Sequence, residues 1–157
     1  MKTVFYSFLL LVSASLGFAA EEAREAEVDD IHEAVFRWQF VHNASGLQTN
    51  AQVYFLQIGE KRGDPTDEFI GRFAGHKPPV RKVSACSAGA GTGVVDKKTG
   101  EKGMIFRITQ IKWKSATEVD VSGGYYEAGE SASSNTYTVK KVKGKWKVTG
   151  DKMLKRA

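Results

Sequence analysis

The stretch "TYTVKKVKGKWKV", residues 136–148, contains the pattern that decides the fold. Apolar and lysine residues alternate on either side of 143–144, which predicts a β-hairpin closed by a two-residue turn. The expected pairs are Lys141 with Trp146, Val139 with Val148, and Tyr137 with Gly150. One face is then apolar and the other is rich in lysine, as alternation along a strand requires. We therefore expect Trp146 to be buried, and Lys145 and Lys147 to be exposed.

A second hairpin is predicted over residues 105–127, with a three-residue loop at 115–117. The expected pairs are Lys114 with Glu118, Trp113 with Val119, Ile111 with Val121, Arg107 with Tyr125, and Ile105 with Glu127. Gly123-Gly124 interrupts this register and suggests a bulge that curves the sheet. Such a bulge would exchange Tyr125 and Tyr126 between the faces, so the pattern leaves open which of them points inward.

Two helices precede these hairpins. Over residues 22–42, apolar residues recur every three or four positions, which predicts a long amphipathic helix. Its apolar stripe is Val28, Ile31, Val35, Trp38 and Val41. A short helix is predicted in "DPTDEFIGRF", residues 64–73, with Asp64 as N-cap, Pro65 at the first helical position and Gly75 as the stop. Its expected buried residues are Phe69, Ile70 and Phe73.

These elements predict an α+β fold in which one long N-terminal helix and one short helix pack on a curved antiparallel sheet. The helix "VDDIHEAVFRWQFVHN" (28–43), the short helix at 64–73 and the strands "YTVKKVKGKWKVTGDKML" (137–154) resemble the nuclear transport factor 2-like (NTF2-like) superfamily. The resemblance, to a small exported bacterial-type member, covers nearly all of residues 21–157. It implies a cone-shaped domain with a pocket open at one end. The family usually shows two helices before the first strand, and no catalytic Asp/Tyr or Asp/His set can be placed here, so no catalytic residue is implied.

The first 20 residues, "MKTVFYSFLLLVSASLGFAA", have the pattern of a secretory signal peptide. A lysine is followed by a short apolar core and then by small residues that suit a cleavage site. The apolar core is shorter than the roughly 20 residues of a spanning helix. We therefore expect a secreted or periplasmic protein with a single domain at 21–157 and no membrane span after removal of the signal.

Charge is unevenly distributed along the chain. The formal net charge is +5, and removal of Lys2 with the signal leaves 5 − 1 = +4. Acidic residues gather at 21–33 and basic residues at 140–156. Nucleic-acid binding would need a continuous basic groove or stacking platforms, which the pattern does not indicate, so no nucleic-acid partner is expected. The basic strands are expected to be solvated or to lie near the acidic helix.

The segment "GRFAGHKPPVRKVSAC", residues 71–86, places His76 close to Cys86, the only cysteine. A Cys–His nucleophile would need a positive environment and a third orienting group, neither of which the sequence indicates. We expect the segment to be a helix end that leads into a strand, with a buried and slowly reacting thiol. No metal or other cofactor is expected, because the three histidines have no metal-binding spacing. Asn43-Ala44-Ser45 matches a glycosylation acceptor, which matters only in a host that glycosylates such sites.

The candidate ligand-binding residues are Arg107, Tyr125, Glu127, Trp38 and Tyr137. The first three would form one cluster on the inner face, and the two aromatic residues would line a pocket. An arginine beside Glu127 would keep that carboxylate charged, which favours binding over general-base catalysis. Three functions therefore stay open. The first is a non-catalytic binder of a small molecule or peptide. The second is a pocket enzyme of the isomerase, dehydratase or hydrolase kind. The third is a protein–protein interaction module that could dimerise through its sheet.

Overall fold

The computed structural model describes residues 7–42, 50–89, 91–129 and 131–156. Asn43, in the predicted glycosylation acceptor, lies outside these ranges. The α+β class is confirmed. The elements are α1 (Ser7–His42), β1 (Val53–Ile58), α2 (Asp67–Gly71), β2 (Val80–Lys82), a 3-10 turn (Val83–Ala85), β3 (Cys86–Gly89), β4 (Gly93–Asp96), β5 (Gly103–Ser115), β6 (Glu118–Ala128), β7 (Ser131–Val142) and β8 (Lys145–Arg156).

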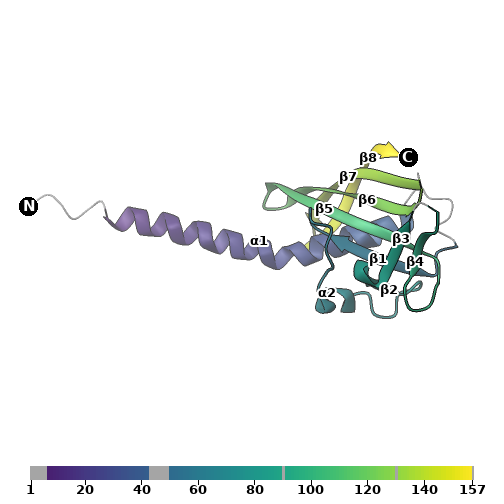
Figure 1. Cartoon of the computed structure of the whole chain (residues 1–157). Helices are drawn as coiled ribbons and strands as arrows, with labels where there is room; N and C mark the ends of the chain where they lie inside the picture. The colour runs from purple at the N-terminus through teal and green to yellow at the C-terminus, as the bar shows by residue number, and fades with distance from the viewer. Residues whose placement is uncertain (1–6, 43–49, 90, 130, 157) are drawn as a thin grey trace, which may run out of the picture.

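The main sheet has six strands in the order β2-β1-β5-β6-β7-β8, and β3 and β4 form a separate two-stranded sheet (Figure 1). Strands β5 to β8 are an antiparallel meander, as the hairpin patterns predict. Strand β1 instead runs parallel to both β2 and β5, so the sheet is mostly rather than wholly antiparallel. Strands β3 and β4 lie in the crossover between β2 and β5.

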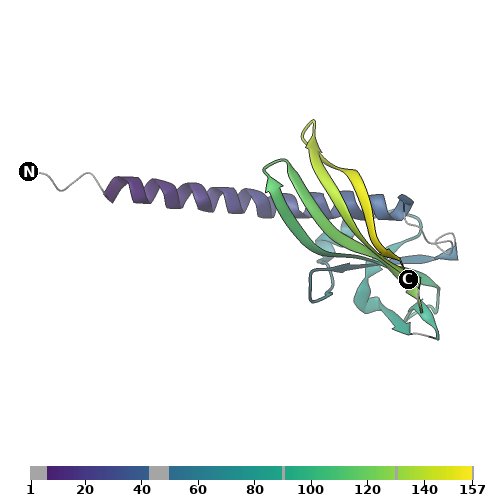
Figure 2. The ribbon, with the colours of Figure 1, turned by 90° about the horizontal axis from the view of Figure 1, so that it is seen from above.

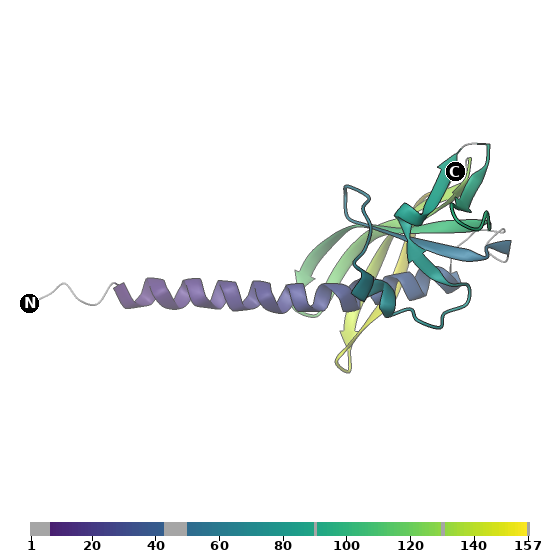
Figure 3. The ribbon, with the colours of Figure 1, turned by 60° about the horizontal axis from the view of Figure 1, so that its bottom comes forward.

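Helix α1 packs on one face of this sheet with its C-terminal half, while its N-terminal half extends away from it (Figure 1, Figure 2, Figure 3). We call this side the helix-covered face. Phe36 and Phe40 are buried there: Phe36 packs against Phe69 of α2, and Phe40 packs against Phe106 of β5. Val41 is 72% exposed, contrary to the prediction. The helix is buried along a stripe through Phe36 and Phe40, so Val41 turns outward.

The opposite face has a smaller core beneath the β3–β4 hairpin. Its buried members are Val53, Phe55, Cys86, Val94 and Ile105. The Cys86 thiol donates a hydrogen bond to the Val83 carbonyl at 3.1 Å. Burial raises the pKa of this thiol, which keeps it protonated. His76 Nδ1 instead lies 2.7 Å from the Pro78 carbonyl oxygen, and no hydrogen bond joins it to Cys86 within the described ranges.

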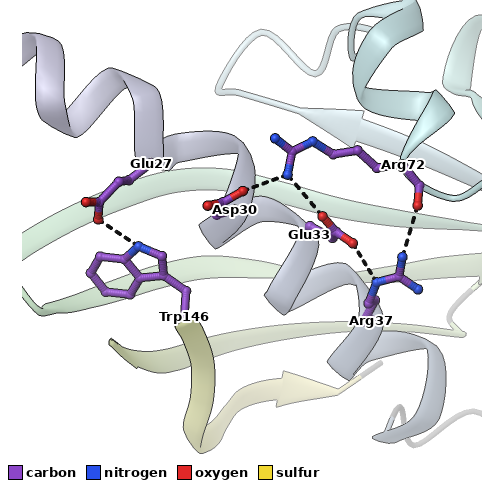
Figure 4. A network of polar contacts seen from close by, with 6 residues as sticks. All are labelled: Glu27, Asp30, Glu33, Arg37, Arg72 and Trp146. Atoms are coloured by element: carbon purple, nitrogen blue, oxygen red, sulfur yellow. Dashed lines mark hydrogen bonds and ion pairs between the residues drawn. The ribbon is translucent and has the colours of Figure 1, made fainter. Parts of the chain in front are cut away.

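Polar contacts attach α1 to the elements on either side of it (Figure 4). Glu27 accepts hydrogen bonds from Trp146 Nε1 at 2.8 Å and from Lys141 Nζ at 2.6 Å. Arg72, just after α2, contacts Asp30 at 2.7 Å and Glu33 at 3.0 Å. The acidic helix therefore does neutralise part of the basic C-terminal hairpin.

The short helix begins later than predicted. Thr66 is the N-cap of α2, and its hydroxyl accepts a hydrogen bond from the Phe69 amide at 3.1 Å. Asp64, the predicted cap, instead accepts from the Ser84 amide at 2.8 Å and so connects this loop to the 3-10 turn. Phe69 and Phe73 are buried as expected.

The C-terminal hairpin has the predicted turn and pairs Lys141 with Trp146 and Val139 with Val148. Trp146 is buried, and Lys145 and Lys147 are exposed, as predicted. The third pair is wrong. An extra residue in β8, Thr149, bulges out between the pairs Val139–Val148 and Thr138–Gly150. Tyr137 consequently faces Asp151 rather than Gly150, and this shift brings a carboxylate to the helix-covered face.

Candidate functional site

A pocket of about 170 Å³ lies between the C-terminal end of α1 and strands β6, β7 and β8. It opens on the helix-covered face, where the resemblance predicts a ligand. Most of its lining side chains are polar, in contrast to the apolar core beside it. The lining residues are Gln39, His42, Tyr125, Ser133, Asn135, Tyr137, Asp151 and Met153.

Gln39 on α1 lines the pocket and connects the helix to the sheet. Its side-chain amide donates to the Arg107 carbonyl and to the Tyr137 hydroxyl, each at 3.2 Å. This close approach of helix to sheet requires a glycine beneath it. A Cβ atom at Gly123 would lie 2.4 Å from the Arg107 carbonyl oxygen and 3.1 Å from Gln39 Nε2. Gly123 therefore allows a buried amide of the helix to bond directly to the sheet.

Asp151 occupies the outer side of the pocket, where two side chains orient its carboxylate. Trp38 Nε1 donates to one oxygen at 3.1 Å, and Asn135 Nδ2 donates to the other at 2.7 Å. The Trp38 ring also stacks on His42, with 3.7 Å between the ring centroids. Each carboxylate oxygen can accept a further bond, so Asp151 remains able to contact a ligand.

Asn135 is the unusual group of the site. The residue is only 6% exposed, and its Oδ1 atom has no hydrogen-bond partner among the described residues. A buried polar atom without a partner costs about 1–3 kcal/mol. Because Nδ2 is committed to Asp151, a rotation of the amide would break that bond. The wall of the pocket therefore contains a buried acceptor that the described protein does not satisfy.

Two buried tyrosines complete the inner wall. Burial raises the pKa of Tyr137 far above its ordinary value, and the bond from Gln39 offsets this only in part. The Tyr137 hydroxyl accordingly stays protonated and can still donate. Tyr125 is 3% exposed and lines the same pocket. The site thus combines hydroxyl groups with the amide and carboxylate oxygens of Asn135 and Asp151.

The structure brings together three of the five predicted residues. Tyr125 and Tyr137 line the pocket, and Trp38 reaches it through its bond to Asp151. Tyr125, and not Tyr126, belongs to the helix-covered core, which decides the alternative that the sequence leaves open.

Arg107 and Glu127 do not join this cluster. The β5–β6 hairpin has two register shifts, at Thr109 and at Lys114 in β5. Glu118 therefore pairs with Ser115 and not with the predicted Lys114, and Arg107 pairs with Gly124 and not with Tyr125. Phe106 and Ile108 belong to the helix-covered core, and the Arg107 side chain between them therefore points to the opposite face. Only its Nη2 atom contacts Tyr125, at the backbone carbonyl at 3.1 Å. The predicted pairing of Arg107 with Tyr125 is wrong.

Glu127 lines a different pocket of about 260 Å³, beside β4 and the start of β5. It is buried and accepts a hydrogen bond from Ser131 Oγ at 3.1 Å. The bulge in β5 also moves it out of the predicted register, because Ile105 pairs with Tyr126 instead. Glu127 and Arg107 therefore belong to two separate sites.

Sequence reasoning misses Gln39, His42, Asn135 and Asp151. The inner face of the C-terminal hairpin contains Tyr137 and Val139, and extending it by two residues would have reached Asn135. Asp151 depends on the bulge at Thr149, which no local pattern indicates. Gln39 interrupts the apolar spacing of α1, and its contacts come from residues far along the chain.

No group of three or more His, Cys, Asp or Glu side chains is placed to hold a metal ion within the described part of the chain. Across the same residues, no helix combines the length and apolar character needed to cross a membrane. Comparisons with models of protein families, with curated proteins and with solved structures found no match to this chain.

Proposed function

We propose that this protein is a non-catalytic binding domain that holds a small hydrogen-bond-donating molecule in the pocket of Asn135, Tyr125 and Tyr137. The observation that carries the proposal is the buried Asn135 Oδ1 atom with no partner in the described structure. Such an atom is costly unless a ligand donates to it. A ligand with an N–H or O–H group that reaches this covered atom through a small shift of the neighbouring side chains would satisfy it, and the exposed Asp151 could accept a second bond.

Pocket size limits the class of ligand. The volume is about 170 Å³, and an apolar cavity of about 150 Å³ accommodates benzene. The expected ligand is therefore one ring with a few substituents, such as a phenol, an aromatic amide or an aromatic amine. The tyrosine rings would pack against its apolar part, as aromatic side chains do in ligand pockets.

Membership of the NTF2-like superfamily is part of this proposal. Its support is the order of one long helix, one short helix and a curved sheet, with a pocket between helix and sheet. Export is proposed on the pattern of residues 1–20, and the extension of the N-terminal half of α1 away from the sheet agrees with a removable segment (Figure 2).

The test compares small one-ring probes with and without a hydrogen-bond donor. Phenol and benzamide are titrated against toluene by NMR, with the wild type and the Asn135→Leu variant. We expect the wild type to bind phenol and benzamide at least tenfold more tightly than toluene, and the variant to lose this preference while it still binds toluene. Ser134→Ala, on the exposed neighbouring residue, is the control.

Equal binding of phenol and toluene by the wild type, or an unchanged preference in Asn135→Leu, would contradict the proposal. Tyr137→Phe provides a second variant that keeps the ring but removes the donor next to Asn135. Native mass spectrometry of protein from its own host would identify a natural ligand. Conversion of a bound compound during these measurements would favour the enzyme alternative, and a stable dimer without ligand would favour the interaction module.

A further inference from the structure

A second pocket lies on the face of the sheet opposite α1 and shares one lining residue, Ser133, with the pocket just proposed for a ligand. Its volume is about 450 Å³, and it is formed by the turn after β1 together with β5, β6, β7 and β8. Three of its side chains are cationic, and three lining residues have a hydroxyl group. These six are Arg62, Arg107, Lys155, Thr109, Ser133 and Ser134.

The backbone fixes two of the cations in place. Arg62 lies in a tight turn that is closed by two hydrogen bonds between Ile58 and Gly63, both at 3.0 Å. It adopts the left-handed conformation, at φ 55°, which few residues other than glycine tolerate. Gln57 Nε2 donates to the Arg62 carbonyl at 3.1 Å and stabilises this turn. Arg107 is half-buried, and its Nη2 atom is anchored on the Tyr125 carbonyl.

Among the described residues, no acidic side chain pairs with these cations. Elsewhere, cations meet carboxylates, as Arg81 meets Asp96 at 2.6 Å and Arg72 meets Asp30 at 2.7 Å. Within the residues that the structure describes, no ion pair is formed by Arg62, Arg107 or Lys155. Burial, and then the charge of Arg62, lower the pKa of Arg107. The protein therefore holds like charges close together, which is unfavourable unless an anion joins them.

We infer that this pocket binds a small, doubly charged oxyanion, namely a phosphate or sulfate group. Guanidinium groups present several N–H donors in a planar arrangement that matches such oxyanions. The Thr109 hydroxyl already donates to the Ser122 carbonyl at 3.2 Å, so the hydroxyl that can supply a further donor is that of the exposed Ser134. Three cations match a doubly charged group better than a single carboxylate. The volume exceeds that of the anion alone, so an organic group attached through an ester would also fit.

Isothermal titration of the full-length protein tests this inference with sodium phosphate, sodium sulfate, phenyl phosphate and sodium acetate at matched ionic strength. We expect saturable binding of the doubly charged anions and at least tenfold weaker binding of acetate. Tighter binding of phenyl phosphate than of phosphate would identify an ester as the natural form, and equal binding would identify the free anion. Either result supports the inference. Similar binding of acetate and phosphate would overturn it.

Variants separate a built site from general surface charge. Arg107→Gln and Arg62→Gln are expected to weaken phosphate binding about tenfold and about fivefold, respectively. Lys61→Gln removes the same charge one residue away but does not line the pocket, so its binding should stay within twofold of the wild type. A loss in Lys61→Gln equal to that in Arg62→Gln would overturn the inference.

Two further measurements complete the test, a check of folding and a competition experiment. Circular dichroism checks that each variant is folded, and if Arg107→Gln is not, Arg62→Gln and Lys155→Gln decide the outcome, because both residues are exposed. A single-stranded oligonucleotide is titrated as a competitor. Displacement of phosphate by the oligonucleotide at far lower concentration would replace the small anion with a nucleic acid and overturn the inference.

Discussion

The two pockets lie on opposite sides of one sheet, share Ser133 in their linings, and differ in charge. The helix-covered pocket presents oxygen atoms, including those of Asn135 and Asp151. The opposite pocket presents the cations Arg62, Arg107 and Lys155. Neighbouring residues of a strand point to opposite faces, so a single sheet can present oxygen atoms on one side and cations on the other.

Irregular backbone at the centre of the sheet produces this separation. Thr109 bulges from β5 between the pairs Ile108–Gly123 and Gln110–Ser122, so residues before and after the bulge exchange faces. Without that extra residue, Arg107 would point toward α1 and would add a cation to the buried wall. The bulge and the two glycines next to it therefore decide which face receives the positive charge.

The most damaging substitution for this arrangement is predicted to be Gly124→Ala. A Cβ atom there would lie 2.0 Å from the Ser133 carbonyl oxygen, so β6 and β7 would have to move apart between the two pockets. We expect a loss of more than about 3 kcal/mol in the free energy of unfolding, above the usual range for overpacking. Urea denaturation measures this loss.

Gly71→Ala is the matched control, because a Cβ atom at Gly71 has no neighbour within 4 Å. Its stability should equal or slightly exceed that of the wild type, since alanine favours a helix. A Gly124→Ala protein as stable as this control would show that the contact of β6 with β7 at this point does not separate the two faces.

Protonation of His32, on α1, should lower the free energy of unfolding. His32 packs edge-on against Phe69, and burial lowers its pKa from 6.5 to about 4. Because the folded pKa lies below the unfolded one, the unfolded chain binds the extra proton between these values. The contribution of His32 is complete above pH 6.5 and falls by about 3 kcal/mol as the pH drops to 4.

The measurement is the difference in unfolding free energy between the wild type and His32→Leu at pH 7 and at pH 4. Carboxylates that titrate in both proteins cancel in this difference. We expect the unfolding free energy of the variant, relative to that of the wild type, to be about 3 kcal/mol higher at pH 4 than at pH 7. A difference that does not change with pH would show that the helix-covered face tolerates a buried positive charge.

The smallest effect is expected on the opposite face. Arg107→Met removes the bond to the Tyr125 carbonyl but also removes the repulsion from Arg62, so the unfolding free energy should change by less than about 1 kcal/mol. Added salt should stabilise the wild type slightly more than the variant, because it screens that repulsion. A loss above about 2 kcal/mol would make Arg107 a structural residue and weaken the contrast between the faces.

Much of the secondary structure could be predicted because it depends on neighbours in the sequence. Alternation around the turn at 143–144 correctly gives the pairs Lys141–Trp146 and Val139–Val148 and the burial of Trp146. The apolar spacing of residues 22–42 correctly predicts a helix, since side chains three or four positions apart share one face. The predicted cap at Asp64 is wrong. The Asp64 carboxylate can accept a hydrogen bond from any nearby backbone amide, and in the fold it accepts from Ser84 while Thr66 caps the helix.

The sequence by itself therefore determined the α+β class, the alternation around the C-terminal turn and the aromatic residues Tyr137 and Trp38 of the candidate site, whereas the choice of Tyr125 over Tyr126 came from the structure. Only the tertiary structure decided that Thr109 and Thr149 bulge, that Arg107 leaves the cluster, and that Asn135 and Asp151 enter it. The physical reason is the distance along the chain over which each feature is decided. A strand's period follows from local backbone geometry. The bulges instead depend on which register best buries β5 to β8 against a helix whose hydrogen-bond partners in these strands lie 68 to 119 residues away in the chain.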